Sequence, residues 1–92
     1  MNIEKLDKID PQKYSLSSQI KLVLVFDNQI GIIKKRKSRI IMKDGEKILE
    51  IFDKIKEFEP LVEFSLITNA PICGKTRKFF AQKKISIIEI EE

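Results

Sequence analysis

The segment of residues 61–90 constrains the fold more than any other part of the chain. It reads in order as an apolar strand at 61–68, a short loop with Pro71 and Gly74, a helix, and a second apolar strand at 85–90. A strand, a helix and a strand within about thirty residues are typical of a βαβ unit. If the two strands are neighbours, they are parallel with a right-handed crossover. The C-terminal part of the chain is therefore predicted to contain a parallel strand pair.

A β-hairpin is predicted upstream of this unit. Residues 20–26 form an apolar, β-branched run, and residues 30–33 form another after the turn-forming pair Asp27-Asn28. Gly31 inside the second run indicates a bulge or a close approach of another segment. Residues 39–43 are predicted to add a third strand.

A long helix is predicted between the hairpin and the βαβ unit. It is expected to run from Glu46 to about Phe58, after a turn at Asp44-Gly45 in which Asp44 is the candidate N-cap. Pro60 ends it. The apolar residues that fall on one face at helical spacing are Ile48, Ile51, Phe52, Ile55 and Phe58.

The first nineteen residues are predicted to be a short helix followed by a linker. Ile3, Leu6 and Ile9 recur at three-residue spacing, and Asp10-Pro11 ends that pattern. Residues 20–92 then form a single domain. The fold class is α/β (α+β), with a small mixed sheet of four to five strands, an N-terminal β-hairpin, a C-terminal βαβ unit and two main helices.

Composition limits the functional classes. Charged residues make up 35% of the 92 residues, the net charge is +4, and lysine and isoleucine are abundant. Many charges of both signs are typical of hyperthermophiles, so an archaeal source is predicted. No signal peptide or membrane span is visible, and the single cysteine cannot form an internal disulfide, so a cytoplasmic protein is expected. A homodimer is plausible, since a core of this size gains from a partner.

The loop of residues 69–77 is the first candidate site. A helix start after a strand offers free N–H groups and a positive dipole end, which favour an anion. The candidate anion-binding residues are Gly74, Lys75 and Thr76. Asn69 and the triplet 74–76 resemble the Walker A pattern, but Asn69 replaces its first glycine and Pro71 removes an N–H donor. The loop therefore favours simple anion binding over nucleotide hydrolysis.

Cys73 lies in the same loop and gives an alternative function. A thiol at a helix start can have a lowered pKa. Residues 68–80 contain Asn69, Pro71, Cys73-Gly74 and Arg77, and this segment resembles the cysteine segment of thioredoxin-like arsenate reductases and monothiol glutaredoxins. The resemblance implies a thiol-dependent redox protein or reductase, with Cys73 as the nucleophile and Arg77 nearby.

A basic loop is the second candidate site. Five of the six residues at 34–39 are cationic and could bind nucleic acid through its phosphates, although no aromatic residue is interleaved for base stacking. The alternative is an ordinary charged surface loop. The cationic residues are Lys34, Lys35, Arg36, Lys37 and Arg39.

Metal chemistry and histidine-based catalysis are not indicated. With one cysteine and no histidine, neither a zinc site nor a Ser-His or Cys-His pair can form. A metal-dependent nuclease needs paired carboxylates, usually with a lysine. Asp27 lies at a strand end, but residues 31–34 provide Lys34 without the acid. The sequence therefore predicts a binding or interaction module without a cofactor, whose partner is nucleic acid or another phosphate-bearing ligand, rather than an enzyme.

Overall fold

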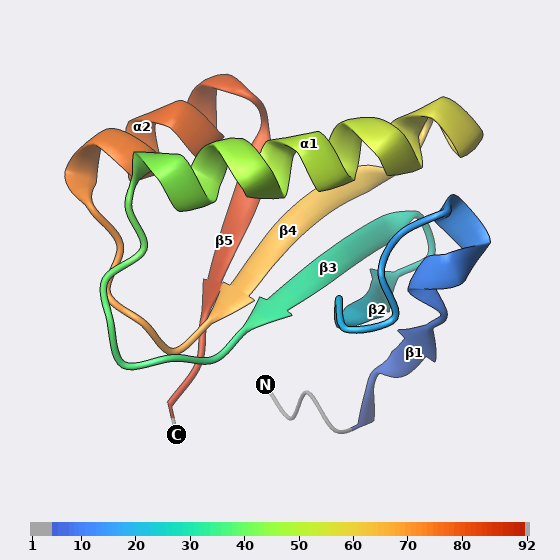
Figure 1. Ribbon diagram of the computed structural model, residues 1–92, viewed down its shortest axis with the longest axis horizontal. Coiled ribbons are helices and arrows are strands. Elements are labelled where there is room, and N and C mark those ends of the chain that lie inside the picture. The colour runs from blue at the N-terminus through green and yellow to red at the C-terminus, as the bar shows by residue number, and fades with distance from the viewer. Residues whose placement is uncertain (1–4, 92) are drawn as a thin grey trace.

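The computed structural model describes residues 5–91 as a five-stranded sheet with two α-helices on one of its faces (Figure 1). The strands are β1 (Asp7–Ile9), β2 (Leu22–Phe26), β3 (Gln29–Lys34), β4 (Glu63–Thr68) and β5 (Ile85–Glu89). The helices are α1 (Met42–Phe58) and α2 (Gly74–Gln82), and a short 3-10 helix, η2 (Pro11–Tyr14), follows β1. The predicted fold class, a mixed sheet with two main helices, is confirmed.

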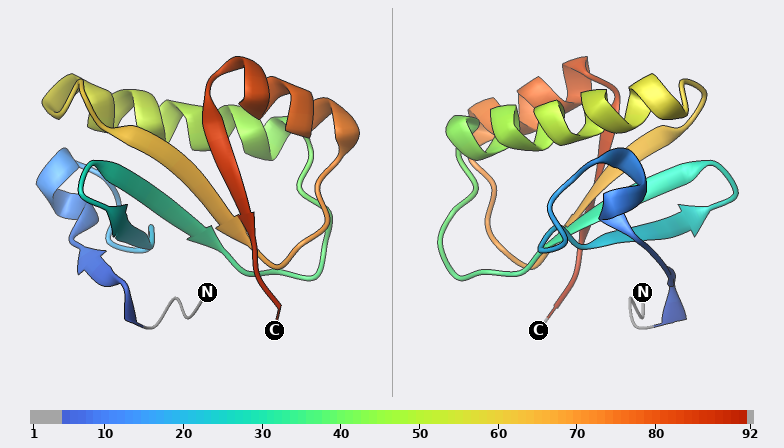
Figure 2. Two further views of the ribbon diagram at one scale, coloured as in Figure 1. Left: turned by 180° about the vertical axis from the view of Figure 1, so that it is seen from behind. Right: turned by 45° about the vertical axis from the view of Figure 1, so that its right-hand side comes forward.

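The strands lie in the sheet in the order in which they occur in the chain. β1, β2 and β3 form an antiparallel meander, whereas β3, β4 and β5 are parallel. The predicted hairpin and the predicted parallel βαβ unit are both present. Successive right-handed crossovers that advance in one direction leave their helices on the same face of a sheet. The views in Figure 2 agree that α1 and α2 both cover that one face.

The main core lies between this face of the sheet and the helices. Ile48, Phe52 and Ile55 of α1 are buried at the spacing that the sequence predicted, and Phe52 stacks on Phe64 of β4 with ring centroids 4.4 Å apart. Phe80 of α2 is fully buried. The strands contribute Leu22, Ile30, Ile32, Phe64, Leu66 and Ile85 to the same cluster.

A second, smaller cluster lies on the opposite face of the sheet. Its buried members are Val23, Val25 and Ile67. Gly31 lies between two of these side chains, because a Cβ built on it would be 2.8 Å from Ile67 Cδ1 and 3.0 Å from Val25 Cγ2. The close approach predicted at Gly31 is therefore present, and the irregular register of the hairpin lies instead at Leu24–Phe26 of β2.

The start of α1 differs from the prediction. The helix begins at Met42 rather than Glu46, so the predicted third strand at residues 39–43 is wrong, and Gly45 is helical. Ile40 keeps one bridge, to Ile72. Asp44 is not the N-cap but lies three residues after it, where its carboxylate accepts a 2.9 Å hydrogen bond from the N–H of Ile41. This bond satisfies a free donor of the first turn, which explains why the helix starts four residues early.

The N-terminal part also differs from the prediction. The short helix expected from Ile3 to Ile9 is wrong for residues 7–9, which form β1 and pair with β2. Ile3 lies outside the described residues. Tyr14, placed by the sequence in a linker, is 1% exposed, and its hydroxyl donates to Glu59 after α1. No helix within residues 5–91 combines the length and the apolar character needed to cross a bilayer.

Candidate functional site

Two adjoining recesses open at the start of β2, beside the end of β3. Their volumes are about 420 Å³ and 720 Å³, and both are lined by Ile20, Lys21, Ile33 and Lys35. Lys8, Ile9, Leu22 and Val23 complete the lining of the first recess. The second is completed by Ser17, Gln19, Ile32, Lys34 and Lys47. We refer to the two together as the lysine recess.

The lysine recess exists because β2 and β3 end at different places. The N–H of Ile33 donates to the carbonyl of Lys21 at 3.0 Å, and Ile20 is held in a turn by a bond to Ser17. The chain before β2 thus turns away from the sheet, whereas β3 continues to Lys34. The end of β3 therefore forms one wall of a concave site, and residues of β1 and α1 form further walls.

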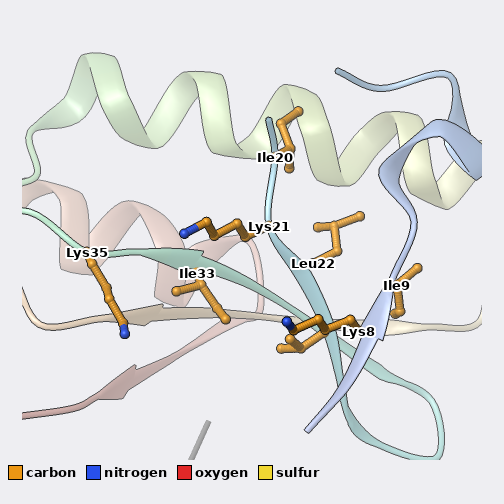
Figure 3. Close-up of a pocket in the computed structure, with 8 residues that line it drawn as sticks. Lys8, Ile9, Ile20, Lys21, Leu22, Ile33 and Lys35 are labelled. Atoms are coloured by element: carbon orange, nitrogen blue, oxygen red, sulfur yellow. The ribbon is translucent and has the colours of Figure 1, made fainter. Parts of the chain in front are cut away.

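Among residues 5–91, the charges that line the lysine recess are all of one sign. Five lysines line it, and no aspartate or glutamate within that range does. Figure 3 shows the amino groups of Lys8, Lys21 and Lys35 arranged around the side chain of Ile33. Aliphatic stems packed along apolar side chains, with the ammonium groups toward water, are the usual behaviour of lysine at such a surface. Like charges lining a concave surface focus a positive potential there and favour an anionic ligand.

Only part of the predicted basic loop contributes to this recess. Lys34 and Lys35 line it, whereas Lys37 and Arg39 are exposed outside it. Arg36 has a structural role, because its guanidinium forms an ion pair with Asp44 and donates to the carbonyls of Ser38 and Arg39 at 3.3 and 2.9 Å. Arg36 N–H also donates to the side chain of Asn69. This network fixes the path from β3 into α1.

Asp44 is stabilised in its charged form by these contacts. The hydrogen bond from the Arg36 guanidinium, and then the one from the N–H of Ile41, lower the pKa of the Asp44 carboxyl. Asp44 thus neutralises Arg36 and caps α1 at the same time. The charge of Asp44 is in this way paired with Arg36, which does not line the lysine recess.

The start of α2 presents the second group of predicted residues. Gly74 and Lys75 are exposed, but Thr76 is fully buried and packs toward α1, since a Cβ on Gly45 would lie 3.1 Å from its methyl carbon. Cys73 is half-buried at the N-cap position. The pKa of its thiol is lowered, first by the N–H of Lys75 and then by that of Thr76. Anion binding by Gly74, Lys75 and Thr76 stays a prediction.

Arg77 of α2 lies across from the last strand. Its guanidinium forms an ion pair with Glu89 at the end of β5, and both side chains are about half exposed. Neither residue lines the lysine recess. The pair therefore joins α2 to β5 at a surface separate from the recess.

No cluster of metal ligands is present in the described part of the chain. Within residues 5–91, no group of three or more histidine, cysteine, aspartate or glutamate side chains is close enough to hold a metal ion.

Comparison with known proteins relates the fold to nucleases. No protein-family model matches the sequence, and no curated protein matches it either. A crystal structure of a repair endonuclease from Pyrococcus abyssi is similar, with a TM-score of 0.64 and 12% identity over 77% of this chain and 31% of that one. EndoMS in its apo form gives a TM-score of 0.63 and 11% identity, over 78% and 34% of the two chains. This chain spans about a third of the length of either structure.

The resemblance to thioredoxin-like arsenate reductases and glutaredoxins is wrong. A repair endonuclease and EndoMS are similar in fold to this chain, and the thiol-dependent redox function of Cys73 is not supported. In the thioredoxin-like families the cysteine unit opens the fold, whereas here it connects β4 to β5 at the end of the sheet. The similarity of residues 68–80 is thus limited to a strand, a turn and a helix start.

The sequence prediction missed three of the five recess lysines. Lys8, Lys21 and Lys47 come from β1, the entry to β2 and α1. Lys21 had a recognisable signal, because it is the single charged residue inside the apolar run 20–26. Lys8 and Lys47 had none, since each lies among other charges and joins the recess only through the tertiary fold.

Proposed function

We propose that this protein binds the sugar–phosphate backbone of nucleic acid in the lysine recess, without hydrolysing it. The observation that carries the proposal is a concave site lined by five lysines, with no carboxylate among the lining residues in the part of the chain that the structure describes. Each lysine that neutralises a phosphate releases a bound counterion, and this supplies affinity that does not depend on base sequence.

The fold supports the same class of partner. The similar solved structures include a repair endonuclease, a protein that acts on nucleic acid. A fold alone does not carry an activity, so the argument rests on the site. None of the described residues that line the recess has an aromatic side chain that could stack on bases. We therefore expect contacts to phosphates rather than to bases, and little preference among sequences.

Binding without cleavage follows from the ligand set. Metal-assisted phosphodiester hydrolysis uses carboxylates to place one or two cations beside the reacting phosphate. The recess offers ammonium groups in place of such carboxylates. Ammonium groups attract a phosphate but repel a divalent cation, so the same residues that favour binding disfavour a bound metal.

The dependence of affinity on salt tests the proposal. Fluorescence anisotropy with labelled single-stranded and duplex DNA and RNA of mixed sequence gives the association constant over a series of salt concentrations. Five phosphate contacts would give a slope of log K against log salt of about −4.5 for duplex DNA and about −3.5 for single strands. A variant in which Lys21 and Lys35 are both changed to glutamine should lose two of these contacts. The magnitude of its slope should be smaller by about 1.8 for duplex DNA and by about 1.4 for single strands.

Two control variants make the test specific to the recess. Lys56 and Lys78 are exposed on α1 and α2 outside it. Changing both to glutamine removes the same net charge, and we expect the slope to stay closer to that of the unchanged protein. Changing Lys37 and Arg39 to glutamine measures the share of the basic loop outside the recess. Equal losses in the recess variant and the Lys56/Lys78 variant would refute a localised site.

A further inference from the structure

The outer edge of β5 is the surface that carries a further inference. β5 is the last strand of the sheet, and β4 is its neighbour in the described residues (Figure 2, left). The N–H of Ile90 donates to the carbonyl of Thr68 on β4. Backbone groups alternate in direction along a strand, so Ser86 and Ile88 face β4 in the same way. The N–H and C=O groups of Ile85, Ile87 and Glu89 therefore point away from the sheet.

This edge has few of the features by which sheets avoid pairing with other chains, and Glu89 is the single charged residue within β5. Natural edges are protected by short strands, proline, bulges and charged residues. The opposite edge, β1, has them: it is three residues long, includes Asp7 and Lys8, and is followed by Pro11. β5 has five residues without proline, pairs with β4 in continuous register, and contains Ile85, Ile87 and Ile88.

The charges beside β5 favour a second copy of the same strand in antiparallel orientation. Lys83 and Lys84 precede the strand, whereas Glu89 and Glu91 lie at its end and just beyond it. In an antiparallel pair, the basic start of one strand lies beside the acidic end of the other. A parallel pair would instead place like charges together. Glu89 already pairs with Arg77 of its own chain, so Glu91 is the acid left to meet the lysines of the second copy.

We propose that two copies of this protein associate through antiparallel pairing of their β5 strands, forming one continuous ten-stranded sheet. In this register, Ile87 lies opposite Ile87 of the second copy, and the two residues exchange backbone hydrogen bonds. Ile85 of each copy likewise exchanges backbone hydrogen bonds with Glu89 of the other. The proposal uses none of the recess residues and is independent of nucleic-acid binding.

Association is tested on the full chain by sedimentation equilibrium across a range of protein concentrations. We expect a dimer whose population rises with concentration. Ile87→Pro removes an N–H that points away from β4, so it keeps the pairing within the chain, and proline is tolerated at such edge positions. We expect Ile87→Pro to raise the dissociation constant of the dimer at least about tenfold. The reason is that the hydrogen bond donated by the N–H of residue 87 is lost from both copies. Ile87→Val keeps the N–H and should remain dimeric.

Amide hydrogen exchange of the unchanged protein supplies a test that does not depend on how the proline variant folds. In a monomer, Ser86 and Ile88 are protected by β4, and Ile85, Ile87 and Glu89 exchange fast. In the proposed dimer all five are protected at high protein concentration. A chain that stays monomeric, a dimer with fast exchange at Ile87, or a dissociation constant unchanged in a folded Ile87→Pro variant would each overturn the proposal.

Discussion

The contact between Gly31 and Ile67 allows a quantitative test of the packing beneath the sheet. A Cβ added to Gly31 would lie 2.8 Å from Ile67 Cδ1, closer than side-chain carbons approach each other, and Ile67 is fully buried. Overpacking of this kind costs about 1–3 kcal/mol, and replacing glycine in a strand offsets about 0.5–1 kcal/mol of that. We expect Gly31→Ala to lower the free energy of unfolding by about 1–2 kcal/mol.

Ile67→Val removes Cδ1, the nearest of the atoms that the new methyl group would meet, and leaves Val25 Cγ2 at 3.0 Å. By itself this change should cost about 1 kcal/mol, as other buried Ile→Val changes do. In the double variant, the alanine methyl occupies the space left by Cδ1. The double variant should therefore be more stable than the sum of the single effects by about 1–2 kcal/mol. For a domain of this size such a difference is about 4–16 °C in Tm.

The assay is urea unfolding followed by far-ultraviolet circular dichroism, with the four proteins of the cycle measured together. A second cycle that combines Gly31→Ala with Ile48→Val is the control, because Ile48 lies on α1 across the other face of the sheet. That pair should be additive. If the Gly31 and Ile67 changes were also additive, or if Gly31→Ala were stabilising, the close approach would not limit this position.

Two further predictions concern titratable groups at the ends of α1. Asp44→Ala should lower the free energy of unfolding by about 1 kcal/mol in urea titrations, because it removes the carboxylate that holds the N–H of Ile41. The pKa of Asp44 is lowered in the folded state. Its contribution to the free energy of unfolding is therefore complete above the ordinary carboxyl pKa and is lost as pH falls through the pKa of the folded protein. The unfolding curves of Asp44→Asn and the unchanged protein should accordingly converge in acid. Burial, and then the hydrogen bond to Glu59, raise the pKa of Tyr14 to about 12. The stability that the neutral Tyr14 hydroxyl supplies is therefore complete below about pH 10 and is lost as pH rises toward 12. Tyr14→Phe should lack that alkaline loss of Tm, and a phenol that titrated near its ordinary pKa would contradict the buried contact.

Periodic hydrophobic patterns predicted most of the fold. Ile48, Phe52 and Ile55 indicated the buried face of α1, and the apolar runs indicated β2, β3, β4 and β5. Each of these signals is local and depends on side chains that one element buries. The strand pairing within the hairpin and the βαβ unit followed from short connections.

The start of α1 could not be read in the same way. Ile40, Ile41 and Met42 look like part of a strand, because an apolar run does not distinguish a strand from a helix start. What decides the case is the contact of Asp44 with Ile41 and Arg36, and the bridge of Ile40 to Ile72. The last of these joins segments more than thirty residues apart, which no local pattern reports.

The candidate site was predicted only where its residues are adjacent in the chain. Lys34 and Lys35 were identified as part of a basic run, and Arg36 belonged to the same run although its charge is paired with Asp44. Lys8, Lys21 and Lys47 join the recess from three distant segments. The sign of the charge at a site can thus be guessed from composition, but its shape depends on tertiary packing.

The order of the strands has a consequence for how the chain folds. Each strand pairs with the strand that precedes it, so no step has to bring together the two ends of the chain. The longest connection runs from Lys34 to Glu63, and α1 occupies most of it, which shortens the distance that must be closed. The parallel β3–β4 pairing nevertheless joins residues 34 positions apart, and because non-local parallel pairing forms slowly, it is the step expected to limit the folding rate. The sheet can grow outward from the β2–β3 hairpin by adding one neighbouring strand at a time.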